Sequence, residues 1–356
     1  MKAITVMLTA SGSQFAPGII RCFKNNRERE IRVIGGDMSN SPSNRYLVDA
    51  FYQIPPVSDP NYAKTIASIC KKENVDVLFP QMSAELPVYL DNIELFNEIG
   101  TFVSMTKGHT LEIANNKLKL LEFMKANNIP TAQFVGVNSF DEFEKGLTYL
   151  GYPEKPVCVK VPTLSGSRGI RIIDAKKSRY QIFLHEKPSS LITTKEDMIQ
   201  VLKEAEEFPQ LLLMEYLSGD EYSIGVLADN GKVKYLAGRR NPVMVMSISQ
   251  ESIVEKNATA YEIATQLVEK LNLDGVIGMD FMFSQDGDIK IMEINPRIDA
   301  TMSVFAAAGL NLPYLCVKQI LGEELPEINI NYGTTLKRRY HEFFTNAQGE
   351  AIYLED

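Results

Sequence analysis

The stretch Gly278–Arg297 carries acids, an amide and an arginine at spacings that suit metal and phosphate chemistry. Asp286-Gly287 is a strong two-residue turn signal between two apolar runs. With that turn Asp280 faces Glu293, and carboxylates directly opposite each other repel. Asn295 lies two residues further on, so it projects from the same strand face. Such oxygen ligands suit a hard cation such as Mg²⁺; the alternative is a surface hairpin with solvated acids.

The same two-residue turn predicts the register of the whole hairpin. Phe283 would face Lys290, and Phe281 would face Met292. Arg297 follows the second strand, and its planar cation is well suited to phosphate.

A second chemical feature is a lysine inside an apolar strand, followed by a small flexible loop. Lys160 lies in the predicted strand Val157–Val161, where a buried ammonium needs an anionic partner. A nucleotide phosphate or a structural carboxylate would serve. The loop Ser165–Gly169 contains glycine, so its backbone N–H groups could lie against phosphate oxygens. The Walker A pattern is absent, so this is not a P-loop.

Composition limits the function classes. The 356 residues carry a formal net charge of −8, which argues against a general nucleic-acid or anionic-membrane binder. Four scattered cysteines are expected to be small buried residues, and three histidines leave little for a zinc site. Apolar runs are too short to cross a bilayer, and the first residues resemble a strand more than a signal peptide. We therefore expect a cytoplasmic protein.

The order of elements predicts the fold class. Strands alternate with helices through about residue 106, which predicts an α/β domain with a doubly wound parallel sheet. Such sheets bind ligands at the carboxyl ends of their strands. Three polar sets fall there, Ser11–Gln14, Asp37 and Gln81–Glu85, either as ligand contacts or as ordinary turn and cap residues. A helix is expected over Thr110–Asn127.

The second half of the chain has an α+β pattern. Leu211–Leu217 and Glu221–Leu227 are predicted as strands joined by a tight turn at Ser218–Asp220, in an antiparallel meander. Gly238–Pro242 would leave that meander, and Asn257–Leu271 would form a long helix.

At this point the residues resemble a known family, the ATP-grasp enzymes, in the group near biotin carboxylase and the carbamoyl-phosphate synthase large chain. The glycine loop after Lys160, the segment MEYLSGDEYS and the signature MEINPR occur in the order and spacing of that family. The resemblance implies a Rossmann-like pre-ATP-grasp domain followed by a two-lobed ATP-grasp fold. The implied boundaries are 1–107 for the first domain, 108–325 for the ATP-grasp domain with its nucleotide lobe at about 155–220, and 326–356 for a C-terminal appendage.

The resemblance also implies a role for each residue that matches a family motif. ATP and Mg²⁺, with Mn²⁺ as an alternative ion, are the implied cofactors. Lys117 and Lys160 would contact the nucleotide, and Lys160 and Arg297 would act on the transferring phosphoryl group. The remaining roles are phosphate cover by Gly166, Ser167 and Gly169, main-chain bonds to adenine from Glu215 and Leu217, ribose binding by Glu221, and metal binding by Asp280, Glu293 and Asn295.

The implied activity is an ADP-forming ligase that joins a small carboxylate to an amine through an acyl phosphate. Two alternatives remain: a bicarbonate-using, carbamoyl-phosphate-synthase-like or carboxylating enzyme with a partner, and a non-catalytic ATP-binding regulatory protein. The chain departs from the family after EINPR, where Ile298–Thr301 follow, and it lacks a biotinyl-lysine motif. The implied partners are ATP and the small substrates, with no nucleic acid or membrane, and homodimers are common among relatives. Candidate substrate contacts are Arg239, Arg240, Arg338 and Arg339.

Overall fold

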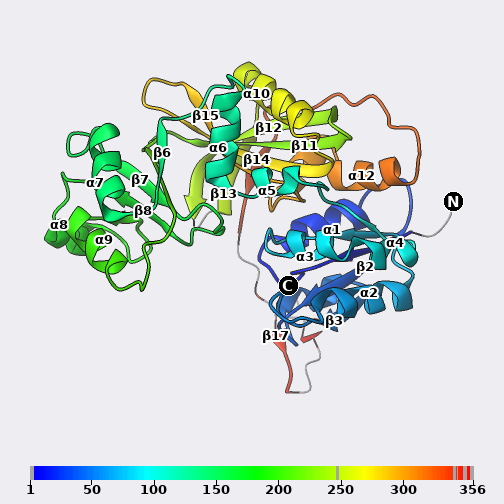
Figure 1. The fold of residues 1–356 in the computed structure, drawn as a ribbon. Helices are drawn as coiled ribbons and strands as arrows, with labels where there is room; N and C mark the ends of the chain where they lie inside the picture. The colour runs from blue at the N-terminus through cyan, green and yellow to red at the C-terminus, as the bar shows by residue number, and fades with distance from the viewer. Residues whose placement is uncertain (1–3, 246–247, 340–341, 343, 348–350, 353–356) are drawn as a thin grey trace. The chain divides into compact units, whose positions relative to one another are not determined.

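The structure is a computed structural model that describes residues 4–245, 248–339, 342, 344–347 and 351–352. The chain forms two compact units (Figure 1). Unit 1 comprises Met1–Val103, Gln250–Ile253 and Ala300–Asp356. Unit 2 comprises Ser104–Ser249 and Val254–Asp299.

Unit 1 is built on a five-stranded sheet in the order β3-β2-β1-β4-β5. Each neighbouring pair is parallel, because a crossover connection separates successive strands. The central strands are buried and apolar, as both faces of such a sheet must be. This confirms the predicted doubly wound sheet. The elements are β1 (Ile4–Leu8), α1 (Ala16–Lys24), β2 (Ile31–Asp37), η1 (Ser43–Leu47), β3 (Ala50–Gln53), α2 (Tyr62–Glu73), β4 (Val77–Phe79), α3 (Glu85–Asp91), α4 (Ile93–Glu98) and β5 (Phe102–Val103).

The polar residues at the carboxyl ends of these strands bond to neighbouring loops. Asp37 accepts hydrogen bonds from the backbone N–H groups of Gly12 at 2.8 Å and Ser39 at 2.9 Å. The Thr9 hydroxyl donates to Glu85 at 2.7 Å, and Glu85 is fully buried. These contacts favour the interpretation that Asp37 and Glu85 are turn and cap residues, which stabilise neighbouring loops, over a role as ligand contacts.

Later segments complete unit 1. Among them α12 packs against α1. β17 pairs with β18 in antiparallel orientation, and residues 348–350 between them lie outside the described residues. These elements are β13 (Ile248–Val254, of which 250–253 belong here), α11 (Ser303–Ala307), α12 (Leu312–Ile320), β16 (Thr335–Lys337), β17 (Phe344–Thr345) and β18 (Ala351–Ile352).

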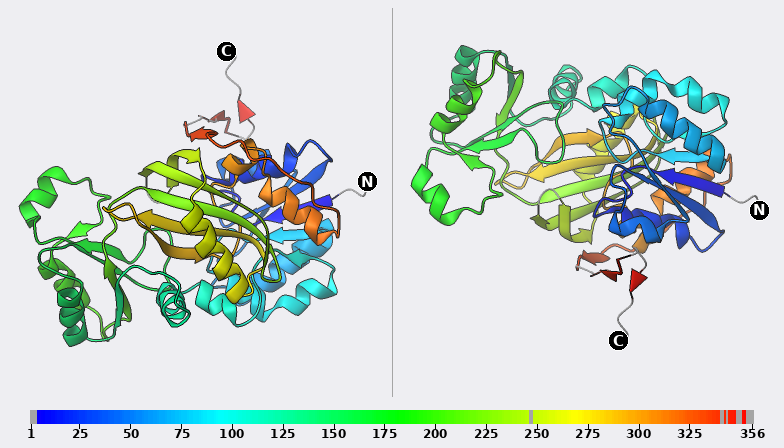
Figure 2. Two further views of the ribbon diagram at one scale, coloured as in Figure 1. Left: turned by 90° about the horizontal axis from the view of Figure 1, so that it is seen from above. Right: turned by 90° about the horizontal axis from the view of Figure 1, so that it is seen from below.

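Unit 2 contains two sheets. The first has the order β6-β10-β7-β8-β9, and its core lies between these strands and the helices α7 and α9. Figure 2 shows this part in green. Its elements are β6 (Phe134–Val137), α7 (Phe140–Tyr149), β7 (Val157–Lys160), β8 (Ile170–Ile173), α8 (Arg179–His185), β9 (Ile192–Thr193), α9 (Lys195–Leu202) and β10 (Leu211–Glu215).

The second sheet of unit 2 is antiparallel and runs β15-β14-β11-β12. Helices α6 and α10 contribute to the apolar core on one of its faces (Figure 1). The other face is polar and carries the site described below. The elements are α5 (Thr110–Ala114), α6 (Lys117–Ala126), β11 (Glu221–Asp229), β12 (Lys232–Val245), α10 (Ala258–Lys270), β14 (Gly275–Phe283) and β15 (Ile289–Asn295).

Two sequence predictions about unit 2 are wrong. β10 and β11 do not pair as a meander: β10 lies between β6 and β7, and β11 lies between β12 and β14. Residues 216–220 are therefore a connection between two sheets. Gly238–Pro242 does not leave the strand, because β12 continues through it. Local turn chemistry cannot show which of several sheets a strand joins.

The predicted helix over Thr110–Asn127 is two helices. The chain breaks at Asn115 and Asn116, and the Asn116 side chain accepts hydrogen bonds from the backbone N–H groups of Leu118 and Lys119. This N-cap starts α6 at Lys117. Among the described residues, no helix is both long and apolar enough to cross a membrane.

Candidate active site

The hairpin of β14 and β15 brings Asp280 opposite Glu293, as predicted, but by a different register. Phe283 pairs with Ile289 and Phe281 with Ile291, so the predicted partners Lys290 and Met292 are wrong. The turn is longer than two residues, with Ser284 N–H donating to the Asp288 carbonyl at 2.7 Å. A bulge next to Asp280 then shifts the register by one residue, and the two differences cancel.

The bulge decides which face Glu293 occupies. Before it, Ile289 and Ile291 point into the apolar core; after it, Ile294 does so. An uninterrupted strand would alternate, so Ile291 in the core would place Glu293 in the core as well. The extra residue, Met292, turns Glu293 and Asn295 to the polar face beside Asp280. Bulges often redirect a side chain next to an active site in this way.

The side chains of Asp280, Glu293 and Asn295 converge. The Asn295 amide nitrogen lies 3.0 Å from an Asp280 carboxylate oxygen and 3.4 Å from a Glu293 oxygen. A hydrogen-bond donor thus lies between two carboxylates, where a cation would be attracted; turning the amide oxygen inward would give up the hydrogen bond that this oxygen accepts from Arg297 Nη2. Two carboxylates and a carboxamide oxygen are a donor set that fits Mg²⁺. The residues present therefore fit the metal that the sequence predicts.

Lys117 joins this group from the start of α6. Its ammonium lies 2.8 Å from Glu293 Oε2 and donates to the Leu164 carbonyl at 2.8 Å. The side chain is 10% exposed, so the charge is held largely away from water. Lys117 thereby links the metal-type carboxylate to the segment that precedes the glycine loop.

Lys160 is buried at the end of β7, with 6% of its surface exposed. Burial would raise the pKa of Glu293, but Lys117, Lys160 and Arg297 together hold that pKa below its ordinary value. Three cations from separate segments therefore act on one carboxylate. This supports both readings of the sequence, a carboxylate partner for Lys160 and a cationic place for phosphate.

The pKa values of two neighbouring acids shift in the opposite direction. Burial and the nearby carboxylates of Glu221, Asp299 and Glu293 raise the pKa of Asp280 well above its ordinary value, against the opposing charge of Arg239. Burial also raises the pKa of Glu221, which Arg239 again opposes. Four carboxylates thus share a region of low solvent exposure.

Arg239 is only 3% exposed and binds within this group. Its guanidinium lies 3.1 Å from Asp299 Oδ2 and donates to the Asn241 amide oxygen. Asn241 in turn donates to Glu221 at 2.9 Å and to Ser223 at 3.0 Å. Sequence reasoning named Arg239 as a substrate contact and gave no role to Asp299 or Asn241. The alternation of residues 239 and 241 on a strand was the available signal.

Arg297 lies two residues after the end of β15. Its Nη1 donates to the Ile298 carbonyl at 2.8 Å and its Nη2 to the Asn295 amide oxygen at 3.0 Å. Its buried Nε has no hydrogen-bond partner among the described residues. A buried cationic donor without a partner is costly unless a ligand supplies the acceptor.

The glycine loop has the backbone that small residues permit. Gly166, Ser167 and Gly169 have φ values of 66°, 59° and 65°, in the left-handed region. At Gly169 an added Cβ would lie 2.8 Å from the Val161 side chain, so only glycine fits there. The loop returns to β7 through a hydrogen bond from Val161 N–H to the Gly169 carbonyl.

Of the residues expected at adenine, Glu215 is the last residue of β10 and Leu217 lies in the connection between the two sheets. The Glu215 backbone N–H donates to the Gln133 carbonyl at 3.0 Å, and the Glu215 carboxylate accepts from the Gln133 N–H at 2.9 Å. Leu217 is buried, 3% exposed. The Glu215 N–H is therefore engaged within the protein, and adenine binding by these residues stays a prediction.

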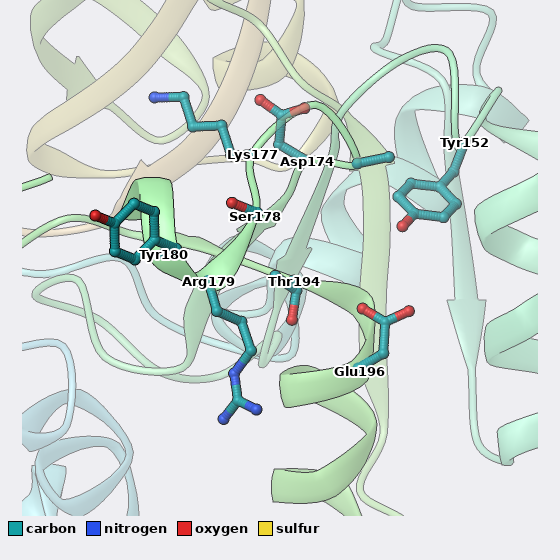
Figure 3. A pocket seen from close by; sticks show the side chains of 9 residues that line it. Tyr152, Asp174, Lys177, Ser178, Arg179, Tyr180, Thr194 and Glu196 are labelled. Atoms are coloured by element: carbon teal, nitrogen blue, oxygen red, sulfur yellow. The ribbon is translucent and has the colours of Figure 1, made fainter. Parts of the chain in front are cut away.

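A separate hollow of about 490 Å³ lies beside β8, α8 and α9 (Figure 3). None of the predicted site residues lines it. Its cations are engaged, since Lys177 pairs with Glu186 and Arg179 with Asp197 at 3.0 Å. The hollow therefore offers no unpaired charge from these two residues.

Two family models match the chain. Residues 6–104 match the PylC-like N-terminal domain, and residues 207–339 match an ATP-grasp family described as "ATP-grasp in the biosynthetic pathway with Ter operon".

The chain is also similar in sequence, at low identity, to carbamoyl phosphate synthase large chains. The arginine-specific, mitochondrial carbamoyl phosphate synthase large chain of Neurospora crassa is 23% identical over 310 residues, which cover 83% of this chain and 25% of that one. The chain therefore spans about a quarter of the length of the curated relatives it matches.

Solved structures share the fold. N5-carboxyaminoimidazole synthetase from Staphylococcus aureus, complexed with ADP, has a TM-score of 0.68 at 17% identity, covering 93% of this chain and 81% of that one. The biotin carboxylase domain of 2-oxoglutarate carboxylase from Hydrogenobacter thermophilus, with MgADP and bicarbonate, has 0.69 at 19% identity, covering 93% and 73%. An L-amino acid ligase from Bacillus licheniformis has 0.61 at 16%, covering 90% and 75%.

The parallel sheet of unit 1, the two sheets of unit 2 and the family-model matches agree with the resemblance read from the sequence: residues 207–339 are similar to an ATP-grasp family, residues 6–104 are similar to the PylC-like N-terminal domain, and the fold is that of the solved structures above.

Proposed function

We propose that this protein is an ATP-dependent ligase that joins a small carboxylate to an amine through an acyl-phosphate intermediate. The observation that carries the proposal is the meeting of Lys117, Lys160 and Arg297 around Glu293, opposite Asp280. A cationic group next to a divalent-metal donor set suits a Mg²⁺-bound triphosphate.

The physical task of the first step is to bring two anions together. The substrate carboxylate attacks the γ-phosphorus of ATP, and ADP leaves. Asp280, Glu293 and Asn295 would hold Mg²⁺, which would supply positive charge to the phosphate oxygens. Lys160 and the free Nε of Arg297 bind the same oxygens and stabilise the charge that spreads over them during transfer.

The other assignments concern nucleotide binding. Lys117 links α6 to the glycine loop through the Leu164 carbonyl, so it would position Gly166, Ser167 and Gly169 over the phosphates. Closing that loop would exclude water from the acyl phosphate. Glu221 would contact ribose.

A second candidate function uses bicarbonate as the carboxylate. The carbamoyl phosphate synthase relative and the structure that holds bicarbonate favour it. The first step would be the same, with bicarbonate attacking the γ-phosphorus.

ADP formation tests both candidates. Purified protein with Mg²⁺ and ATP is assayed against the twenty amino acids, other small carboxylates and bicarbonate, beside Glu293→Ala. Stimulation by a carboxylate and amine pair, lost in the variant, supports the ligase; stimulation by bicarbonate alone supports the second candidate. Metal-dependent ATP binding with no stimulation by any compound would contradict both and indicate a regulatory ATP-binding protein.

A further inference from the structure

Asp299 is a carboxylate of this site that nucleotide and metal binding leave unused. A Cβ added to Gly278 would lie 2.7 Å from Asp299 Cβ, 3.2 Å from its Cγ and 3.6 Å from Asn295 Cβ. Gly278 and Asp280 are two residues apart on β14, so they face the same side of the sheet. Asp299 therefore lies on the face of the sheet that carries Asp280, beside Asn295.

Arg239 fixes the Asp299 carboxylate from the opposite side. Arg239 pairs across the sheet with Ser223, which pairs with Asp280, so the three lie in one row. Its guanidinium holds Asp299 Oδ2 at 3.1 Å and is itself held by Asn241. Arg239 is thus a positioning residue that presents Asp299 in one orientation.

The second oxygen of Asp299 is available. Among the described residues Oδ1 accepts no hydrogen bond, and the side chain is 15% exposed. A partly exposed carboxylate oxygen with no donor attracts a cation or a neutral hydrogen-bond donor.

The reaction brings such a cation. At neutral pH most amines arrive as ammonium ions, and a carboxylate that the metal and the phosphate-binding cations leave unused is a favourable contact for an ammonium ion. Asp280 and Glu293 are assigned to Mg²⁺, and Lys117 already pairs with Glu293. Asp299 lies beside Asn295 and takes part in neither contact.

We propose that Asp299, positioned by Arg239, binds the ammonium group of the acceptor amine. This rests on the proposed ligase function and specifies its second substrate as a cationic amine. After the ammonium ion gives one proton to water, its nitrogen attacks the acyl-phosphate carbon and the C–N bond forms. The C–O bond to phosphate breaks, phosphate leaves with the electron pair, and a second proton from nitrogen ends on phosphate.

The test compares a charged nucleophile with an uncharged one. Wild-type protein, Asp299→Asn and Asp288→Asn are assayed for ADP formation with the stimulating carboxylate and with either an amino acid amine or hydroxylamine, which is largely uncharged at neutral pH. Asp288, 73% exposed near the hairpin turn, is the matched control. We expect Asp299→Asn to raise KM for the amine by about tenfold or more. The KM for ATP and the hydroxylamine reaction should change less than about threefold, because they do not use this charge.

Equal losses with amine and hydroxylamine, or no loss with either, would overturn the role of Asp299. If Asp299→Asn does not fold, Arg239→Gln is the second variant, and it should raise the amine KM selectively because Asp299 loses its orientation. Wild-type protein that forms no ADP with any carboxylate and hydroxylamine would instead refute the ligase function itself, and this role with it.

Discussion

The Lys117 ammonium lies 2.8 Å from Glu293 Oε2, and this ion pair connects the start of a helix to a strand far along the chain. It exists because Asn116 caps α6 at that point and because a bulge turns Glu293 to the polar face. The helix cap and the bulge lie far apart in the sequence. Together they bring the Lys117 ammonium to the Glu293 carboxylate.

Lys160 should contribute to ATP use more than to stability. Replacing it with methionine keeps the apolar stem but removes the buried charge that acts on Glu293. We expect Lys160→Met to lower kcat/KM for ATP by about a hundredfold or more, the usual loss for one electrostatic contact to a reacting group. Lys155→Met, at an exposed position before the same strand, is the control. Equal kinetic constants for both variants would contradict a phosphate role for Lys160.

Gly238 should tolerate no side chain. An added Cβ would lie 1.8 Å from the Tyr222 hydroxyl oxygen and 2.4 Å from its Cζ, and Tyr222 is fully buried. Tyr222 cannot withdraw easily, since its hydroxyl donates to the Glu255 carbonyl at 2.8 Å. We expect Gly238→Ala to lower the free energy of unfolding by about 3 kcal/mol, at the upper end for overpacking.

Gly36→Ala is the control for Gly238→Ala. Its added Cβ would meet Met7 Cε at 3.0 Å and Ile54 Cγ2 at 3.3 Å, much longer contacts than the 1.8 Å contact at Gly238. Urea unfolding followed by circular dichroism measures both variants, and we expect less than about 1 kcal/mol for Gly36→Ala. Similar losses in the two variants would show that the Tyr222 contact is not the cause.

The sequence predicted that Asp280 faces Glu293, but it did not predict the register that brings them together. Asp280 and Glu293 were paired correctly because an underestimated turn and an unforeseen bulge cancel. Turn type follows from a few local residues, whereas a bulge depends on which side chains the core accepts. The predicted partners of Phe281 and Phe283 are therefore wrong, whereas the predicted pairing of Asp280 with Glu293 is correct.

Contacts between distant segments were beyond sequence reasoning. Arg239 and Asp299 are 60 residues apart, and no spacing rule connects them. The separation of β10 and β11 into different sheets has the same origin, because a turn signal at Ser218–Asp220 describes a change of direction but not the partner strand. The parallel sheet of unit 1 was predictable because alternation of strands and helices repeats along the chain.

Arg29 should stabilise unit 1. Its guanidinium binds Glu323 at 2.7 and 2.5 Å and the Tyr314 hydroxyl at 3.0 Å, and its side chain is 7% exposed. The pair joins residues 294 positions apart. Because Glu323 is 32% exposed and partly solvated, we expect Arg29→Ala to cost about 2 kcal/mol, less than a fully buried pair would.

Chemical unfolding of Arg29→Ala, Glu323→Ala and the double variant measures this coupling. Removing both partners leaves no unpaired charge, so the double variant should be more stable than the sum of the single losses predicts, by about 1 kcal/mol. Arg21→Ala, at an exposed position of α1, should change little. Additive losses would mean that Arg29 acts by packing and not through Glu323.

The native thiols should be almost unreactive. All four cysteines are free and buried, as predicted from the sequence, and burial raises the pKa of Cys22 and of Cys70 from 9.0 to about 12. Since the thiolate is the reactive form, three pKa units lower its population about a thousandfold near neutral pH. We expect Ellman's reagent at pH 8 to label all four thiols in guanidinium but almost none in the native protein.

The pH dependence follows from the same shift. Because the folded-state pKa of Cys22 and Cys70 lies above the unfolded value, keeping these thiols protonated stabilises the fold fully below about pH 9, and that contribution is lost as pH rises toward 12. Native labelling should therefore stay slow between pH 8 and 9, while labelling of the denatured chain accelerates. Rapid native labelling of Cys22 or Cys70 at pH 8, located by peptide mapping, would contradict their burial.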